Sequence, residues 1–158
     1  MTGLSCNSSL ATVPLTLRCL ERMGVSAQSA RLAACVGTNL NNDGITLYEA
    51  MAALFLAHAL GYDLPIAKQI VIVVASIIAG AGVAGIPEAG MIVLPLVLAA
   101  AGLPDQVILA AIPLIMTVDW IIARARSGVN VMSDMLVAIL LDVGKTGSVT
   151  EPQTEAGR

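Results

Sequence analysis

The most restrictive feature of this sequence is a set of polar side chains within a long apolar segment, residues 107–141. Four of these side chains, those of Asp119, Arg126, Asn130 and Asp134, follow one another at steps of seven, four and four residues. Steps of this size return to the same side of a helix, so the four side chains share one face. Because an ionised group at bilayer depth costs at least a few kcal/mol, such a face favours a polar binding cavity. A structural ion pair between helices is the alternative.

The composition favours an integral membrane protein. The chain is 57% hydrophobic and 12% charged, and its mean hydropathy is +0.87. Soluble domains carry roughly 25% charged residues. A soluble core of this size could not bury so much apolar surface, whereas a lipid bilayer can accommodate it. The net charge of −3 is too small to indicate a nucleic-acid partner.

The first part of the chain, residues 1–31, is the only one rich in basic residues before the polar face. It begins with a hydroxyl-rich stretch that ends at Pro14, and it continues into a segment that carries Arg18, Arg22 and Arg31. By the positive-inside rule, this arginine-bearing segment faces the cytoplasm.

The second part, residues 32–61, would be one hydrophobic span if its middle were apolar. Instead Asn41, Asn42, Asp43 and Gly44 place turn formers and a carboxylate there. Each flank is shorter than the ~20 residues that a membrane crossing requires. We interpret this pattern as a transmembrane helix broken at membrane depth, an arrangement with which transporters build ion sites. Two short helices joined by an ordinary turn are the alternative.

The third part, residues 66–103, has two apolar arms that flank the glycine-rich sequence AGAGVAGIPEAG. Each arm is too short to span a bilayer, so the pair predicts a re-entrant hairpin with an ordinary helix–loop–helix as the alternative. Its tip, Ala84–Pro87, shares the pattern of alanine, small residue, branched aliphatic residue and proline with Ala11–Pro14. This similarity fits two hairpins that meet at one site.

The remaining parts are a transmembrane helix over residues 106–142, which carries the polar face, and a polar tail over residues 143–158. The tail has no apolar pattern, and we expect it to be disordered. The parts together predict an all-α integral membrane fold with broken transmembrane helices and re-entrant helical hairpins.

Four motifs in this sequence resemble, in order, the functional signatures of the dicarboxylate/amino acid:cation symporters, the glutamate-transporter family. They are NSSLATVP, NNDGITLYEA, GAGVAGIPEAG and VDWIIARARSGVNVMSD, and the resemblance extends to about Asp142. It implies that residues 1–31 hold the tip and second arm of hairpin 1 with a cytoplasmic connection, 32–61 the broken helix 7, 66–103 hairpin 2, and 106–142 helix 8. The chain would then be only the C-terminal, substrate-binding portion of a multi-pass protein of the cell (inner) membrane, a homotrimer when full-length.

The resemblance also implies roles for individual residues. Arg126 would hold the side-chain carboxylate of the substrate, in keeping with the two hydrogen bonds that a guanidinium forms with a carboxylate. The other implied substrate contacts are Asn130, Ser127, Ser9, Gly85 and Ile86. Sodium ions would bind at three places, formed by Asp134 with Gly37, Asn41 and Asn130, by Asp43 with Asn41, and by Gly80, Ala81 and Val83 with Asn39.

Some positions depart from the pattern of the family. Ala123 stands where amino-acid transporters have an aspartate that pairs with the substrate's amino group. An ammonium group would be poorly compensated there, which favours a substrate such as succinate, malate or fumarate. Ile45 replaces a threonine of the carboxylate pocket. Asn42 replaces a methionine and Leu10 a serine, which leaves the third sodium site and the hairpin 1 contacts open.

We therefore expect a symporter, not an enzyme. Its substrates would be C4-dicarboxylates or acidic amino acids, its coupling ion sodium with protons as the alternative, and it would need no further cofactor. A membrane-embedded hydrolase with paired aspartates among Asp43, Asp119 and Asp134 is a second hypothesis. A fragment that transports nothing is a third.

Overall fold

The computed structural model describes residues 1–83 and 89–148, and within these ranges the chain forms helices and no strands. The prediction of an all-α fold is thus confirmed for the described residues. In chain order the elements are α1 (Thr2–Cys6), α2 (Ser9–Arg22), α3 (Ala27–Arg31), the π-helix η1 (Leu32–Val36), α4 (Gly37–Leu40), α5 (Asp43–Ala59), α6 (Ile66–Gly82), α7 (Ala89–Ala100) and α8 (Asp105–Ser148).

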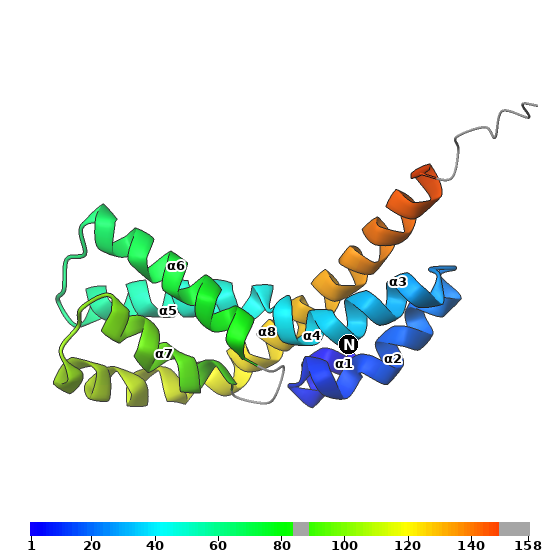
Figure 1. Cartoon of the computed structure of the whole chain (residues 1–158). Coiled ribbons are helices and arrows are strands. Elements are labelled where there is room, and N and C mark those ends of the chain that lie inside the picture. Colours follow the sequence, from blue (N-terminus) through cyan, green and yellow to red (C-terminus); the bar gives the residue numbers. More distant parts are fainter. Residues whose placement is uncertain (84–88, 149–158) are drawn as a thin grey trace, which may run out of the picture.

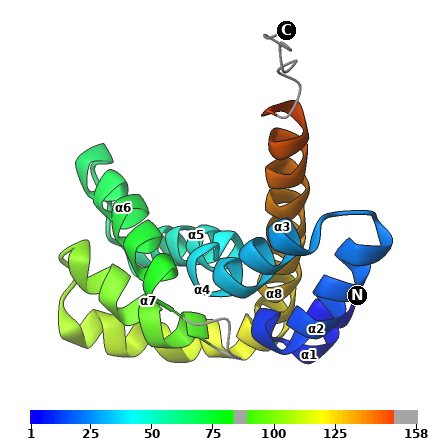
Figure 2. The same ribbon diagram turned by 45° about the vertical axis from the view of Figure 1, so that its right-hand side comes forward.

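The longest helix, α8, connects two groups of shorter helices. Its first part lies with α5, α6 and α7, whereas its C-terminal part lies beside α1, α2 and α3 (Figures 1 and 2). Both views show these two parts of α8 running in different directions. Proline and glycine are common causes of such bends, and α8 contains Pro113 and Gly128.

Each group of helices has its own apolar core. The larger core includes Leu56 of α5, Ile72 of α6 and Leu94 of α7, all with no exposed surface. The smaller core joins Leu20 of α2 to Ala138 of α8. The larger core also includes Ile108 and Ile115 of α8, so it joins α5, α6 and α7 to one another and to the first part of α8.

The helical path is broken where the sequence places its asparagines. Asn41 and Asn42 have non-helical backbone angles, with φ −104° and ψ 68° at Asn41 and φ −99° and ψ 54° at Asn42. A second interruption separates α1 from α2. There Asn7 has the left-handed φ of 50°, and the Ser8 hydroxyl accepts a hydrogen bond from Ala11 N at 3.1 Å, which caps α2.

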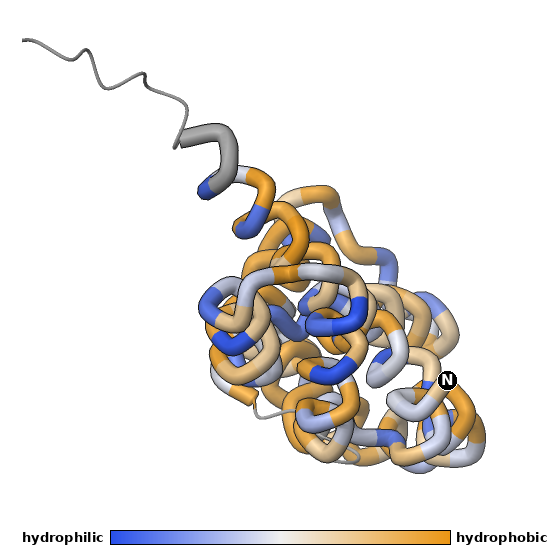
Figure 3. The backbone as a smooth tube through the Cα atoms, turned by 90° about the vertical axis from the view of Figure 1, so that its right-hand side faces the viewer, coloured by the Kyte–Doolittle hydropathy of each residue, from blue (hydrophilic) through white to orange (hydrophobic). Residues whose placement is uncertain are grey.

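The surface is rich in large apolar side chains. Figure 3 shows that hydrophobic residues occur along most of the backbone. Phe55, Ile66 and Leu109 are 63%, 74% and 73% exposed. One helix of the described part, Asp105–Lys145, is long and apolar enough to cross a membrane, and the apolar stretches Ile66–Gly82 and Gly90–Ala100 are shorter. So much exposed apolar surface requires lipid or further protein to cover it.

Two outcomes concern the predicted segments. The two arms of the predicted hairpin form α6 and α7, which pack against each other, while the tip residues 84–88 lie outside the described residues. The polar tail was predicted to begin at residue 143, but α8 continues to Ser148. Lys145 lies in the last turn of this extension, where a positive charge stabilises the helix dipole.

Candidate functional site

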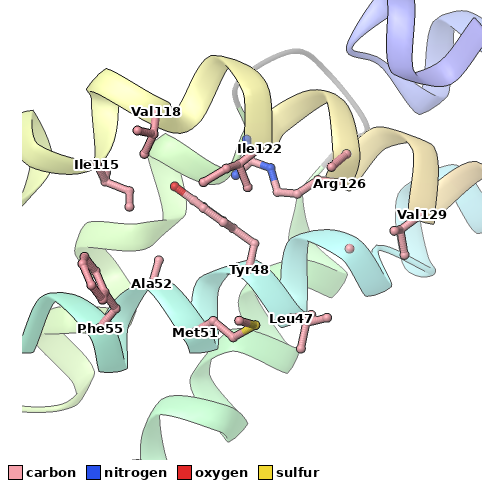
Figure 4. Close-up of a pocket in the computed structure, with 12 residues that line it drawn as sticks. Leu47, Tyr48, Met51, Ala52, Phe55, Ile115, Val118, Ile122, Arg126 and Val129 are labelled. Atoms are coloured by element: carbon pink, nitrogen blue, oxygen red, sulfur yellow. The ribbon is translucent and has the colours of Figure 1, made fainter.

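The polar face of α8 contains a buried arginine that contacts α5. Arg126 is 5% exposed, and its Nη2 lies 3.4 Å from Oδ1 of Asp119, one of the residues predicted to share its face. The guanidinium carbon lies 4.1 Å from the centre of the Tyr48 ring, a cation–π contact that Figure 4 shows from the side. Stacking and pairing together hold the guanidinium in one position.

A second carboxylate lies close to the same guanidinium. Glu49 is fully buried, and among the described residues neither of its carboxylate oxygens has a hydrogen-bond partner, nor does Nη1 of Arg126. A Cβ atom on Gly90 would lie 1.8 Å from Arg126 Nη1 and 2.9 Å from Glu49 Oε1, so the start of α7 can approach both only as glycine. We call Arg126, Asp119, Tyr48 and Glu49 the arginine cluster.

Sequence analysis missed Glu49 and Tyr48 as site residues. Glu49 is nevertheless an acidic residue inside the apolar run that follows the helix break, and an ionisable residue in such a run is by itself a signal of function. Nothing in the sequence marked Tyr48 as a functional residue, because a single tyrosine in a helix is not unusual.

The arginine cluster borders an apolar groove of about 490 Å³ between α5 and α8. Most of its lining is aliphatic or aromatic, as Figure 4 shows for Leu47, Phe55 and Val118. Low polarity strengthens charge–charge interactions, so a carboxylate that reaches Arg126 there would be bound more firmly than in water.

A neutral hydrogen-bond network lies one turn further along α8. Asn130 Oδ1 accepts a hydrogen bond from Gly44 N at 2.7 Å, and Asn130 Nδ2 donates to Asn42 Oδ1 at 3.1 Å. Asn42 Nδ2 in turn lies 3.0 Å from Gly80 O, 2.7 Å from Val83 O and 3.3 Å from Asn39 O. We call the side chains of Asn42 and Asn130 with these backbone partners the asparagine network.

A third group of polar residues, the aspartate cluster, joins the helix break to α8 through Asp134, Asn41, Ser133 and Asp43. Asn41 Nδ2 donates to Asp134 Oδ1 at 3.2 Å and to Ser133 Oγ at 2.9 Å, and Ser133 Oγ donates to Asp43 Oδ2. Asp134 is 1% exposed. Gly37 is adjacent, since a Cβ there would lie 2.4 Å from Asp134 Oδ1.

The aspartate cluster is rich in oxygen atoms, and this determines which kind of metal ion it could bind. The part of the chain that the structure describes holds no group of three or more His, Cys, Asp or Glu residues able to bind a metal ion. The carboxylates of Asp134 and Asp43 and the hydroxyl of Ser133 lie at a broken helix and are hard oxygen groups, which suit a monovalent cation. The residues present are therefore compatible with sodium at this position.

The comparisons with known proteins agree with this chemistry. The sequence matches the sodium:dicarboxylate symporter family over residues 1–143. The chain belongs to this family. Among its curated relatives, excitatory amino acid transporter 4 of Mus musculus is 38% identical over 143 residues, or 90% of this chain and 25% of the relative.

Two further relatives give the same picture. Excitatory amino acid transporter 1 of Rattus norvegicus is 40% identical over 90% of this chain and 26% of its own length, and excitatory amino acid transporter 3 of Mus musculus is 41% identical over 85% and 25%. The chain thus spans about a quarter of the length of the curated relatives it matches. These relatives are transporters, not enzymes, which confirms the expectation of a non-enzyme and leaves the hydrolase hypothesis without support. A sodium:dicarboxylate symporter also implies a membrane location.

For this family member, the structure brings several of the predicted site residues together. Asp134, Gly37, Asn41 and Asp43 meet in the aspartate cluster. Asn130 meets the backbone of Gly80, Val83 and Asn39 through Asn42. Their roles in binding stay predictions.

The other predicted site residues lie outside the aspartate cluster and the asparagine network. Ser127 Oγ donates to Asn7 Oδ1 at 3.3 Å, which brings the α1–α2 junction to α8. The Ser9 hydroxyl is buried without a hydrogen-bond partner among the described residues. Ala81 is exposed, and Gly85 and Ile86 lie outside the described residues.

Proposed function

We propose that this chain forms the substrate- and cation-binding part of a symporter that carries C4-dicarboxylates with sodium. The activity belongs to the full-length protein, in which further segments would cover the exposed apolar faces of α5, α6 and α8. A multi-pass, homotrimeric assembly in the cell membrane and the re-entrant course of both hairpins are part of this proposal.

The observation that carries the proposal is the incomplete pairing of Arg126. Its guanidinium is buried and oriented by Tyr48 and Asp119, yet one of its nitrogen atoms, Nη1, has no hydrogen-bond partner within the described part of the chain. A buried unpartnered donor costs roughly 1–3 kcal/mol. A carboxylate ligand would remove this cost through charge-assisted hydrogen bonds, which are about twice as strong as neutral ones.

The choice of a dicarboxylate over an amino acid rests on Ala123. This residue is 1% exposed and lies on the same helical face, four residues after Asp119 and three before Arg126. A methyl group there gives an ammonium group no partner. The Glu49 side chain lies beside the Arg126 guanidinium where both meet Gly90 at the start of α7. Acidic amino acids are the second candidate, favoured by the names of the curated relatives.

Coupling to sodium rests on the aspartate cluster and its connection to the substrate pocket. Asp134 lies on α8 eight residues beyond Arg126, and Asn41 bonds it to the helix break that precedes Tyr48 and Glu49. A cation at Asp134 would order this break and thereby the position of Tyr48 beneath the guanidinium. Binding of cation and substrate would then favour each other by the same factor in both directions.

The test is ligand-linked thermal stability of the full-length protein that contains this chain, purified in detergent. Succinate and aspartate are added separately, each in sodium and in choline chloride. A shift with succinate that requires sodium, together with no shift for aspartate, is the expected result. A sodium-dependent shift with aspartate alone would replace the dicarboxylate by an acidic amino acid. No shift with either ligand in a folded sample would refute the proposed binding of both and leave the symport function without support.

A further inference from the structure

Three backbone carbonyl groups from two separate segments converge on one amide nitrogen. Asn42 Nδ2 lies 2.7 Å from Val83 O and 3.0 Å from Gly80 O, both at the end of α6, and 3.3 Å from Asn39 O at the end of α4. Gly80 permits this approach, because a Cβ there would lie 2.3 Å from Thr46 Oγ1. Asn42 is 2% exposed, so these contacts are made away from solvent.

The orientation of the Asn42 amide follows from a backbone group whose chemistry is fixed. Gly44 N–H is a donor only, so the Asn130 side-chain atom that faces it at 2.7 Å is the acceptor Oδ1. Asn130 Nδ2 then faces Asn42, whose nearer atom has to be Oδ1. The nitrogen of Asn42 therefore points towards the carbonyl groups, and the assignment of both amides is dictated by the network.

These carbonyl groups belong to the residues that the family resemblance assigns to a third sodium ion, and the side chain present does not fit a cation there. The two hydrogens of an amide NH₂ group carry partial positive charge and point towards the carbonyl oxygens, into the space that a cation would need. A cation between them would meet charge of its own sign. Rotation of Asn42 by half a turn would place Oδ1 among the carbonyl groups, but would then direct Asn42 Nδ2 against Asn130 Nδ2 and leave two buried donors facing each other.

We propose that the Asn42 amide takes the place of this third cation. It supplies the positive partner for the carbonyl groups of Asn39, Gly80 and Val83 as a permanent part of the chain. The end of α6 is then joined to the helix break whether or not sodium is present. For coupling, the proposal means one cation fewer per transport cycle than the three that the resemblance implies, and this consequence rests on the proposed symport function. The absence of a cation at these carbonyl groups is independent of that function.

The direct test uses the unaltered full-length protein. Crystals or grids prepared in thallium(I), a heavier substitute for sodium and potassium, are compared with thallium-free samples. We expect no thallium density among the carbonyl groups of Gly80, Val83 and Asn39. Density between these groups would overturn the proposal, whatever the protein transports.

A substitution gives the functional test. Asn42→Asp keeps the size of the side chain and the acceptor for Asn130 Nδ2, but replaces the donor by a second carboxylate oxygen. At alkaline pH this oxygen and the carbonyl groups form a cation site. The slope of log substrate affinity against log sodium activity should therefore rise by about one relative to the unaltered protein, as linkage requires for one additional ion.

Asn42→Leu is the matched control, because it removes the donor without adding an oxygen ligand. It should lower thermal stability in sodium and in choline alike, with no increase of the sodium slope. A folded Asn42→Asp protein whose slope equals that of the unaltered protein would refute the proposal. If substrate binding shows no sodium dependence in any variant while thallium stays absent from the carbonyl groups, the symport function fails and the structural inference stands.

Discussion

The arginine cluster and the asparagine network lie one helical turn apart on α8, yet they are built in opposite ways. The arginine cluster buries one cation and two carboxylates, and Arg126 Nη1 and both Glu49 oxygens have no hydrogen-bond partner in the described residues. In the asparagine network, each side-chain oxygen and nitrogen of Asn42 and Asn130 has a partner from the chain. The hydrogen bonding of the arginine cluster is therefore incomplete without a ligand, whereas that of the asparagine network is complete without one.

This difference indicates which of the two regions is free to respond to a substrate. An unpartnered buried polar group raises the free energy of the ligand-free state, and a ligand that pairs with it recovers that cost. A fully paired network has no such cost to recover, so it stabilises the arrangement of α4, α5, α6 and α8. Substitutions in the arginine cluster should therefore change binding, and those in the asparagine network should change stability.

The largest effect is expected for Arg126→Lys. Lysine keeps the charge but loses the planar pair of donors and most of the stacking on Tyr48. Substrate affinity should fall roughly 100-fold, since a charge-assisted hydrogen bond contributes about 1.5–3 kcal/mol and 1.4 kcal/mol corresponds to a factor of ten. The measurement is isothermal titration of the full-length protein in sodium.

Arg124→Lys is the matched control for this substitution. Arg124 lies on the same helix, but its guanidinium stacks on Trp120 and Nη1 donates to the Trp120 carbonyl, away from the cluster. Its replacement should leave substrate affinity nearly unchanged. Equal losses for both variants would mean that the overall charge of α8, rather than the geometry of Arg126, determines affinity.

The next effect concerns the asparagine network. Asn130→Leu keeps the branched shape of the side chain but leaves Gly44 N–H and Asn42 Oδ1 buried without partners. Two such groups should lower the free energy of unfolding by about 2 kcal/mol. Chemical unfolding in detergent measures this change, with Asn39→Leu as the control, because the side chain of Asn39 is exposed and only its carbonyl takes part. Undiminished stability with lost substrate binding would instead place Asn130 among the substrate contacts that the resemblance implies.

Much of this comparison could be predicted from the sequence, because it depends on helical periodicity. Asp119, Arg126 and Asp134 share a face at steps that any helix would respect, and the turn formers at Asn41 and Asn42 mark the break. Periodicity also separates the polar face of α8 from its apolar sides. These features are local, because the geometry of a single helix determines which residues share a face.

The other features of the site depend on contacts between segments that are distant in the sequence. A local sequence pattern cannot predict them. The direction of the Asn42 amide is set by Asn130, which is 88 residues away along the chain. The carbonyl groups that this amide then faces, those of Gly80 and Val83, are 38 and 41 residues away. The proximity of Glu49 to Arg126 likewise requires the start of α7 to pass beside both at Gly90. A sequence pattern can show that such residues are unusual, but not which groups they meet.

A smaller effect is expected when the missing carboxylate is restored by Ala123→Asp. A carboxylate at this buried position gives an ammonium group a partner and repels a dicarboxylate. The ratio of aspartate to succinate affinity should rise about tenfold, which corresponds to roughly 1.4 kcal/mol. Competition between the two ligands in sodium measures the ratio, and Ala123→Ser serves as the uncharged control. An unchanged ratio would show that residue 123 does not contact the substrate.

The smallest effect should come from Glu49→Gln, which replaces the buried Glu49 carboxyl group by an uncharged amide and keeps the shape of the side chain. The Glu49 carboxylate competes with an anionic ligand for Arg126, so its neutralisation should raise succinate affinity roughly three- to tenfold. Glu21→Gln, on the exposed side of α2, removes the same charge at a distance and should change nothing measurable. Titration calorimetry of both variants separates the local effect from that of net charge.

A loss of affinity in Glu49→Gln would reverse the assignment of this residue. Glu49 would then contact the ligand directly, and a buried carboxylate that contacts a ligand needs a positive group on it. An acidic amino acid carries such a group, whereas succinate does not. The loss should in that case appear for aspartate and be absent for succinate, and the arginine cluster would bind amino acids even though residue 123 is alanine.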